Sequence, residues 1–202
     1  MTKIKLCGLS CPHDIEAANA LMPDYIGFVF APKSKRYVTP ENAKELKQIL
    51  LPPIQAVGVF VNEKPETVAK LLQDGIVDIV QLHGTEDEEY IAQLRNYTDK
   101  PIIKAFRMKT ADDIESALQS TADYILLDSG AGTGTAFDWG LVQHITRPFF
   151  LAGGLDAGNV ADAVRLLHPY AVDVSSGIET DGLKAKNKMS AFVSAVRKEE
   201  ER

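Results

Sequence analysis

Short apolar runs alternate with amphipathic segments along the whole chain. Eight runs rich in β-branched and aromatic residues recur at intervals of roughly 20–30 residues, and each predicts a β-strand. Most are apolar at nearly every position, which is typical of parallel strands that are covered on both faces. The predicted strands are Ile4–Cys7, Tyr25–Phe30, Gln55–Val61, Val77–Leu82, Ile102–Phe106, Tyr124–Asp128, Phe149–Ala152 and Ala171–Ser175.

The segments between these strands carry the signals of helices. Thr39 followed by Pro40 predicts an N-cap and a proline in the first turn, and Pro65 opens a second helix. Thr85–Glu88 has the form of a capping box, and we expect Asp156 to cap the helix after the seventh strand. The last helix is predicted by an apolar stripe at helical spacing, formed by Met189, Phe192, Val193 and Val196.

The alternation of eight strands with helical segments in 202 residues predicts a single-domain (β/α)8 TIM barrel over residues 1–202, near the lower size limit of that α/β fold. A doubly wound sheet is the structural alternative. It fits less well because the first strand is followed by Cys7-Gly8-Leu9-Ser10 and not by a G-x-G-x-x-G turn. No linker, low-complexity stretch or change of composition divides the chain.

Composition and charge narrow the class of protein. Hydrophobic residues at 45% and charged residues at 25% are typical of globular proteins. The net charge of −6 comes from interspersed acidic and basic residues, so we expect no nucleic-acid partner. The longest clean apolar run, Ala56 to Val61, is far shorter than the ~20 residues that cross a bilayer, and no signal-peptide pattern opens the chain. We therefore expect a cytoplasmic protein without a membrane partner, whose two cysteines stay reduced. A barrel of this minimal size can be a monomer, and we expect a monomer or a homodimer.

Several polar residues fall at the carboxyl ends of the strands, where barrels carry their chemistry. Asp128 ends a buried strand, where a charge is costly unless it is paired or used, and Asp173 lies deeper and could instead bind a neighbouring polar side chain. Cys7 ends the first strand, although a lone cysteine there is commonly a small core residue. Cys7 and Cys11 lack the further cysteines of a zinc or iron–sulfur site. Lys104 could form a Schiff base, as in barrel aldolases, or have a structural or phosphate-side role.

Two glycine-rich loops on neighbouring units predict a phosphate site. Gly153-Gly154 follows the seventh strand and Ser175-Ser176-Gly177 follows the eighth, where barrels commonly bind phosphate through backbone N–H groups. The alternative is that these glycines only form tight turns. A third glycine-rich segment, Gly130–Gly134, lacks the spacing and the lysine of a P-loop, and we expect a mobile active-site loop there.

An ordered set of segments extends over all eight units: Lys5-Leu6-Cys7-Gly8-Leu9, Phe28–Phe30, Ser34–Val38, Val57–Val61, Gln81–Gly84, Leu127–Ser129, Gly132–Gly134, Phe137–Trp139, Ala152–Leu155 and Val172–Glu179. Together these segments resemble the phosphoribosylanthranilate isomerase family of tryptophan biosynthesis. One departure is Lys35, where the family often has proline before the Arg36-Tyr37 pair.

The resemblance implies an Amadori rearrangement that needs no cofactor and no metal. N-(5′-phosphoribosyl)anthranilate would become 1-(2-carboxyphenylamino)-1-deoxyribulose 5-phosphate. The resemblance assigns Cys7 as the general base, Asp128 as the general acid and Arg36 as the partner of the anthranilate carboxylate. The other residues that we expect to bind substrate are Gln81, His83, Gly132, Gly153, Gly154, Asp173, Ser175, Ser176 and Gly177.

Both catalytic groups start in the wrong protonation state. With ordinary pKa values, about 3% of a cysteine is thiolate and about 0.1% of an aspartic acid is protonated at pH 7. Burial and a nearby phosphate would raise the pKa of Asp128. Cys7 needs a lower pKa, which strand-end dipoles or lysine and arginine neighbours could provide.

Other functions fit the sequence less well. The related aminoaldose isomerase of histidine biosynthesis relies on a carboxylate on the first strand, where this chain has Cys7. A barrel phosphate synthase or a class I aldolase would depend on Lys104. A silent phosphate-ligand sensor would not need both Cys7 and Asp128. We also expect a monofunctional chain, with no indoleglycerol-phosphate synthase domain fused to it.

Overall fold

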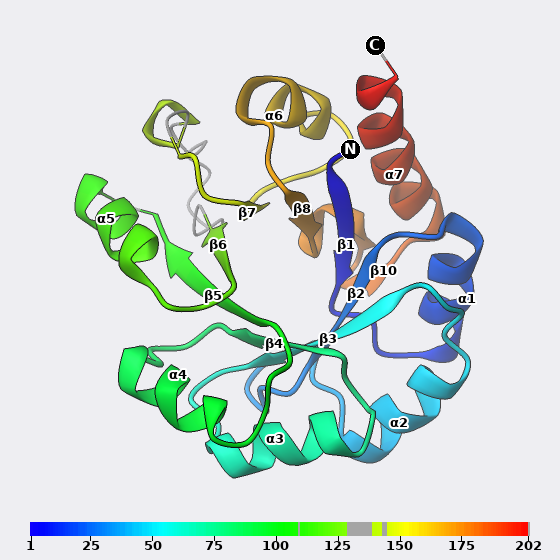
Figure 1. The fold of residues 1–202 in the computed structure, drawn as a ribbon. Helices are drawn as coiled ribbons and strands as arrows, with labels where there is room; N and C mark the ends of the chain where they lie inside the picture. The colour runs from blue at the N-terminus through cyan, green and yellow to red at the C-terminus, as the bar shows by residue number, and fades with distance from the viewer. Residues whose placement is uncertain (109, 129–138, 143–144, 202) are drawn as a thin grey trace.

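Eight parallel strands close into a barrel at the centre of the molecule (Figure 1). The computed structural model describes residues 1–108, 110–128, 139–142 and 145–201. Strand β1 pairs with both β2 and β8, and this closes the barrel. The strands are β1 (Lys3–Cys7), β2 (Tyr25–Val29), β3 (Gln55–Phe60), β4 (Ile79–Leu82), β5 (Ile102–Arg107), β6 (Tyr124–Asp128), β7 (Phe149–Ala152) and β8 (Ala171–Val174). The predicted barrel is confirmed.

Seven helices among the described residues surround the barrel (Figure 1). Helix α7 packs against both α6 and α1, so it joins the last and the first units of the ring. The apolar stripe predicted for this last helix is buried along its whole length. The helices are α1 (Pro12–Leu21), α2 (Pro40–Gln48), α3 (Pro65–Gln73), α4 (Glu88–Arg95), α5 (Ala111–Gln119), α6 (Val160–Leu167) and α7 (Lys186–Glu200).

Helix α4 begins later than its predicted capping box. Its N-cap is Asp87, whose side chain accepts a hydrogen bond from the Tyr90 N–H at 2.9 Å. The Thr85 backbone N–H and hydroxyl both donate to Asn62 instead. The predicted cap at Thr85 is therefore wrong, because a tertiary contact from the loop after β3 takes its side chain.

Helix α6 also has a different cap from the one predicted. Its N-cap is Asn159 and not Asp156. The Asp156 carboxylate accepts from the Gly158 N–H at 2.7 Å and so closes a turn before the helix. Asn159 in turn donates its side-chain amide to the Gly154 carbonyl at 2.9 Å. The start of α6 is thereby tied to the glycine-rich loop that follows β7.

Successive side chains of each strand point alternately into the barrel and toward the helices. At the amino ends of the strands an aromatic cluster fills the interior, with Tyr124 and Tyr170 stacked at 4.9 Å between ring centroids. Tyr25 and Phe150 pack against each other in the same layer, and the Lys3 ammonium lies over the Tyr25 and Tyr170 rings. The opposite end of the barrel, at the carboxyl ends of the strands, contains a cavity.

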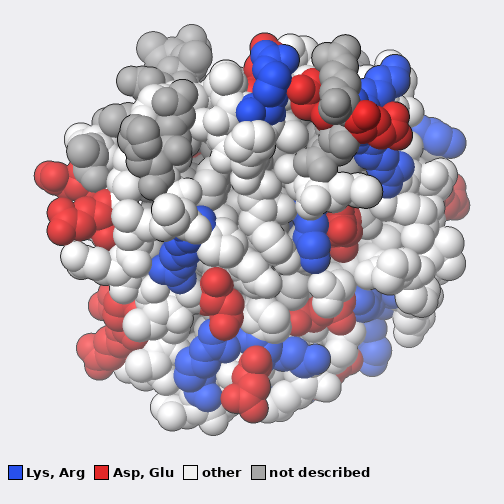
Figure 2. Space-filling view, turned by 45° about the horizontal axis from the view of Figure 1, so that its top comes forward, with Lys and Arg blue, Asp and Glu red and all other residues white. Residues whose placement is uncertain are grey.

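Charged side chains of both signs are mixed on the face shown in Figure 2, where Lys and Arg lie beside Asp and Glu. This matches the interspersed charge of the sequence. In the part of the chain that the structure describes, no helix is long and apolar enough to cross a membrane.

Candidate active site

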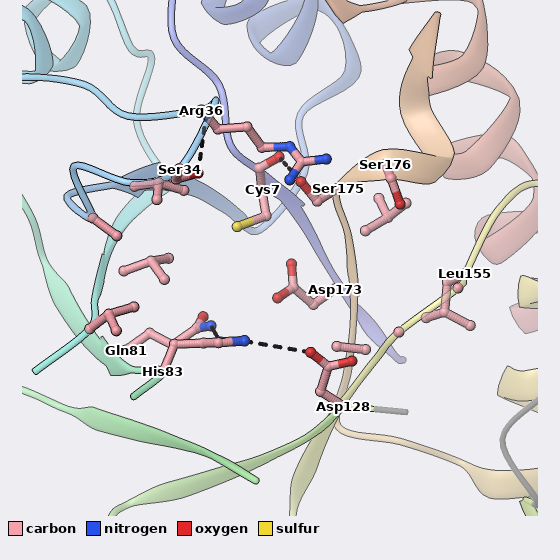
Figure 3. A pocket seen from close by; sticks show the side chains of 18 of the residues that line it. Cys7, Ser34, Arg36, Gln81, His83, Asp128, Leu155, Asp173, Ser175 and Ser176 are labelled. Atoms are coloured by element: carbon pink, nitrogen blue, oxygen red, sulfur yellow. Dashed lines mark hydrogen bonds and ion pairs between the residues drawn. The ribbon is translucent and has the colours of Figure 1, made fainter. Parts of the chain in front are cut away.

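A cavity of about 560 Å³ opens at the carboxyl ends of the strands. Most of the predicted site residues line it although they come from distant parts of the chain (Figure 3). The residues that the cavity brings together are Cys7, Arg36, Gln81, His83, Asp128, Gly153, Gly154, Asp173, Ser175 and Ser176.

Two predicted residues do not fall on the described wall of the cavity. Gly177 lies behind the wall, where a Cβ atom would stand 2.0 Å from the Leu155 carbonyl oxygen. Its missing side chain therefore lets the loop after β8 pack against the loop after β7. Gly132, with the rest of the predicted mobile loop, lies outside the described residues.

Cys7 ends β1 with its thiol directed into the cavity (Figure 3). Gly27 on the neighbouring strand makes room for it, since a Cβ at this position would lie 2.6 Å from Cys7 Sγ. Burial raises the pKa of the Cys7 thiol, and the positive charges of Lys5 and Lys184 oppose this rise only in part. The basic neighbours expected from the sequence are present, but the net direction of the shift is upward.

Below Cys7, Lys5 and Asp173 form an ion pair inside the barrel. Lys5 Nζ donates to Asp173 Oδ2 at 2.8 Å, and the lysine is fully buried. Burial alone would lower the pKa of Lys5, but the charges of Asp173 and Cys7 raise it above its ordinary value. The second carboxylate oxygen of Asp173, Oδ1, is buried without a hydrogen-bond partner among the described residues. Asp173 thus binds a polar neighbour, as considered from the sequence, and also keeps an acceptor at the cavity.

Across the cavity, Gln81, His83 and Asp128 form a chain of polar contacts (Figure 3). Gln81 Nε2 lies 2.9 Å from His83 Nδ1, and His83 Nε2 lies 3.5 Å from Asp128 Oδ2. The Gln81 amide nitrogen can only donate, so His83 Nδ1 accepts from it and Nε2 carries the proton that faces Asp128. Gln81 Oε1 is then a buried acceptor without a partner among the described residues. This arrangement fixes the tautomer of His83 and orients Asp128.

Arg36 follows β2 and reaches the cavity from the side of Cys7 (Figure 3). Its guanidinium is held by Glu179, with Nε 2.6 Å from Oε1 and Nη2 2.9 Å from Oε2. The hydrogen bonds to Glu179 raise the pKa of Arg36 further. Arg36 is therefore a fixed, permanent cation at the edge of the cavity.

Lys104 points away from the cavity. It has the same strand parity as Ile102 and Phe106, which face the helices. Its ammonium donates to the Gly84 carbonyl at 2.9 Å and to Glu86 at 3.1 Å. The aldolase alternative is therefore wrong for this residue, because a Schiff-base lysine has to reach the substrate.

The two glycine-rich loops that follow β7 and β8 meet at the cavity. Gly153 and Gly154 both have positive φ angles, of 90° and 65°, which glycine adopts without strain because it has no Cβ atom. The Ser175 hydroxyl donates to the Cys7 carbonyl at 3.2 Å and thereby ties the loop after β8 to the end of β1. Ser176 lines the cavity, as do Gly154 and Leu155.

Cys11 takes no part in this site. It is exposed and forms the N-cap of α1, whereas Cys7 is buried. Among the described residues, no group of three or more His, Cys, Asp and Glu side chains is arranged to hold a metal ion.

Four residues in or beside the cavity have no role predicted from the sequence. Arg107 ends β5, pairs in register with Asp128 and lines the cavity, as does Ser34. Lys5 could have been found from its position two residues before Cys7, which puts both side chains on one face of β1. The link from Glu179 to Arg36 spans 143 residues and left no local signal.

The comparisons with known proteins agree over the whole barrel. A family model described as N-(5′-phosphoribosyl)anthranilate isomerase matches residues 4–195. The chain is 46% identical over 202 aligned residues to N-(5′-phosphoribosyl)anthranilate isomerase of Endomicrobium trichonymphae. This alignment covers 98% of this chain and 99% of that protein. The chain belongs to the N-(5′-phosphoribosyl)anthranilate isomerase family. It is therefore an isomerase, as the resemblance implied.

Solved structures of N-(5′-phosphoribosyl)anthranilate isomerases have the same fold. The enzyme of Thermotoga maritima superposes with a TM-score of 0.90 at 35% identity, over 98% of this chain and 100% of that chain. A second structure, with a TM-score of 0.86 and 35% identity over 98% of this chain and 100% of that chain, is a complex with reduced 1-(o-carboxyphenylamino)-1-deoxyribulose 5-phosphate.

Proposed function

We propose that the chain converts N-(5′-phosphoribosyl)anthranilate into 1-(2-carboxyphenylamino)-1-deoxyribulose 5-phosphate in tryptophan biosynthesis, with Cys7 as the general base and Asp128 as the general acid. The observation that carries these roles is the placement of the two side chains on opposite sides of one cavity (Figure 3). An aldose–ketose rearrangement needs an acid at one end of the reacting carbons and a base at the other.

Asp128 acts first. Its proton goes to the ring oxygen of the ribose, the bond between this oxygen and C1′ breaks, and the nitrogen lone pair forms an iminium at C1′. His83 holds one oxygen of the Asp128 carboxyl group, and Gln81 fixes the ring of His83. Each proton transfer by such a placed group accelerates the reaction by roughly 10²–10⁴-fold.

Cys7 acts second. Its thiolate removes the proton from C2′, and the electrons of this bond form an enolamine and neutralise the iminium. Loss of the enol proton and protonation of C1′ give the ketone. The charge of Lys5 favours the thiolate, because it opposes the upward effect of burial on the pKa of Cys7.

The remaining polar groups match the rest of the substrate. Asp173 Oδ1 and Gln81 Oε1, two buried acceptors, suit the ribose hydroxyls. Arg36 suits the anthranilate carboxylate, and the loops at Gly153-Gly154 and Ser175-Ser176 suit the phosphate. Gly177 brings these two loops together, and Gly132 is a further substrate contact that the sequence predicts.

We also propose that residues 1–202 form one barrel domain that works in the cytoplasm, without a nucleic-acid or membrane partner, as a monomer or a homodimer. Both cysteines are free, which supports a reducing compartment. The related Thermotoga maritima protein is described as dimeric, and monomers have been generated from it.

The experiment follows the fluorescence of N-(5′-phosphoribosyl)anthranilate, made in situ from anthranilate and phosphoribosyl pyrophosphate. We expect the chain to remove this fluorescence faster than spontaneous hydrolysis does, and the product formed in D2O to carry one deuterium at C1′. A rate equal to the spontaneous rate, with anthranilate as the product, would overturn the proposed function.

A further inference from the structure

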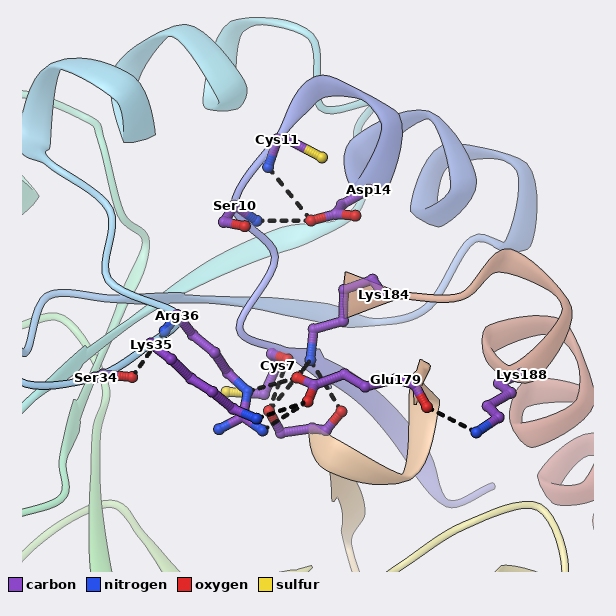
Figure 4. Close-up of polar contacts among 11 residues, drawn as sticks. Cys7, Ser10, Cys11, Asp14, Ser34, Lys35, Arg36, Glu179, Lys184 and Lys188 are labelled. Atoms are coloured by element: carbon purple, nitrogen blue, oxygen red, sulfur yellow. Dashed lines mark hydrogen bonds and ion pairs between the residues drawn. The ribbon is translucent and has the colours of Figure 1, made fainter. Parts of the chain in front are cut away.

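Glu179 holds Arg36 by one edge of its guanidinium (Figure 4). Its Oε1 accepts from Nε at 2.6 Å and its Oε2 accepts from Nη2 at 2.9 Å. A guanidinium has five N–H groups, so this pairing uses two of them on the side-on edge. One N–H group of Nη1 and the second N–H group of Nη2 lie on the other, end-on edge. Arg36 lines the cavity, so this edge decides how it meets a ligand.

A short hairpin fixes the Glu179 carboxylate. Strand β9 (Glu179–Thr180) pairs with β10 (Leu183–Lys184), and Lys184 stands opposite Glu179. The turn residues Asp181 and Gly182 have positive φ angles of 51° and 81°, as two-residue hairpin loops prefer. Across the hairpin, Lys184 Nζ donates to Glu179 Oε1 at 2.8 Å. The hairpin therefore presents Glu179 as a rigid acceptor.

The charges of this cluster leave Arg36 available for an anion. Burial would raise the pKa of Glu179, but hydrogen bonds and charges from Arg36 and Lys184 bring it down to about 2, so the group is an anion at neutral pH. Two cations, Arg36 and Lys184, thus share one carboxylate. Lys35 adds a third positive charge 3.6 Å from Oε2, but its side chain is mostly exposed. The cluster of Arg36, Lys184 and Glu179 keeps a net positive charge, which an incoming anion can neutralise.

The loop after β1 also shapes the path of Arg36. Gly8 has a φ angle of 77°, and a Cβ there would lie 2.5 Å from Arg36 Cδ. The side chain of Arg36 therefore passes through a space that is open only because Gly8 has no side chain, and then reaches Glu179. Two separate elements, this loop and the hairpin, set one position for the guanidinium.

We infer that Glu179 is a positioning residue, which fixes Arg36 so that the end-on edge of its guanidinium receives the anthranilate carboxylate of the substrate. Glu179 blocks the side-on edge and removes the rotamer freedom of Arg36 before the substrate binds, which lowers the entropy lost on binding. Lys184 balances the charge of Glu179, so the carboxylate does not repel the substrate. The inference rests on the proposed function, because that function supplies the carboxylate.

The test compares two ligands that differ only in this carboxylate. One is the reduced product, 1-(2-carboxyphenylamino)-1-deoxyribitol 5-phosphate, and the other is its phenylamino counterpart. Glu179→Gln keeps the shape of the side chain and loses its charge. We expect it to weaken binding of the first ligand about tenfold or more, and of the second by less than about twofold. Lys35→Ala is the matched control, and both affinities should stay within about twofold.

Two further variants keep the test decisive. In an Arg36→Lys background, Glu179→Gln should weaken binding of the carboxylate ligand by no more than about twofold, because Glu179 acts through Arg36. If Glu179→Gln does not fold, Glu179→Asp replaces it, because this variant retains the charge but withdraws it by one methylene. It should likewise weaken binding of the carboxylate ligand more than binding of the phenylamino ligand. Equal losses for both ligands, or unchanged affinity for the carboxylate ligand, would overturn the inference. A wild-type chain that binds neither ligand would instead overturn the proposed function.

Discussion

Lys5 and Asp173 face each other in register between β1 and β8, with Lys5 Nζ 2.8 Å from Asp173 Oδ2. Cys7 lies two residues after Lys5, on the same inward face of β1. The proposed general base thus stands above a buried ion pair. The cation of this pair lowers the pKa of the thiol and the anion raises it, while burial raises it most.

We predict that Lys5→Met moves the ionisation of Cys7 to higher pH. The pKa of Cys7 is already above its ordinary value of 9.0, and the variant removes the charge that opposes this rise. The measurement is the rate of Cys7 alkylation by iodoacetamide against pH, in a Cys11→Ser background because Cys11 is exposed. The pH dependence of kcat/KM should also move to higher pH, since kcat/KM depends on the thiolate fraction.

A second buried lysine–carboxylate pair provides the control. Lys104 and Glu86 are 3.1 Å apart, but on the outward face of β5. Lys104→Met should therefore leave the pH dependence of Cys7 alkylation unchanged, whatever it does to the free energy of unfolding. Identical alkylation profiles for wild type and Lys5→Met would refute the role of Lys5.

Gln81→Glu should change the protonation of His83. A carboxylate at position 81 can only accept, so His83 Nδ1, 2.9 Å away, would have to carry a proton. The imidazolium form would then hold Asp128 as an anion and impair the general acid. We expect kcat at neutral pH to fall about tenfold or more, as for loss of much of one acid–base contribution.

Nitrogen-15 NMR of the His83 ring measures this directly. The wild type should show the proton on Nε2, and Gln81→Glu should add one on Nδ1. Gln93→Glu, an equal charge change on the exposed face of α4, should leave both the spectrum and kcat as they are. A wild-type ring protonated on Nδ1 would contradict the proposed orientation of Gln81.

The contribution of Glu179 to stability should depend on pH. Its pKa falls from 4.5 to about 2 on folding, so the carboxylate stabilises the fold above pH 4.5, and this gain is lost as the pH falls toward 2. Glu179→Gln should therefore be less stable than wild type at pH 7, and the difference should shrink at pH 3. Urea unfolding at the two pH values tests this, and a constant difference would speak against the ion-pair cluster.

Gly27→Ala should damage the position of Cys7. The added Cβ would lie 2.6 Å from Cys7 Sγ and 3.1 Å from its Cα, so the backbone of β1 would have to move. We expect a loss of roughly 1–3 kcal/mol in stability, together with a lower kcat at saturating substrate.

Gly75→Ala is the control. It adds a side chain in open space at a positive φ of 69°, so it should cost stability without a change in kcat. Equal kcat values for Gly27→Ala and wild type would contradict the tight fit around the thiol.

The parts of the fold that depend on local pattern could be predicted from the sequence. Apolar runs gave the eight strands, and strand ends gave residues such as Cys7, His83 and Asp128 that the barrel brings together. Helix starts were less predictable, because Asn62 takes the side chain of Thr85 from a neighbouring loop. Strand parity could have excluded Lys104 from the site, since its neighbours Ile102 and Phe106 face the helices.

Contacts between distant segments could not be predicted in this way. Arg36 and Glu179 are 143 residues apart, and each is unremarkable in its own segment. The direction of the Cys7 pKa shift depends on a balance between burial and two lysines, of which Lys184 lies on the hairpin after β8. Such balances are properties of the folded barrel and not of any one motif.

The most direct test of the account is a comparison of wild type with Cys7→Ala and Asp128→Ala in the fluorescence assay for N-(5′-phosphoribosyl)anthranilate. Each substitution should lower kcat by roughly 10²-fold or more while the affinity for the reduced product stays within about threefold, because the proton transfer is lost and the binding groups remain. Turnover by Cys7→Ala or Asp128→Ala close to that of wild type would contradict the assignment of base and acid.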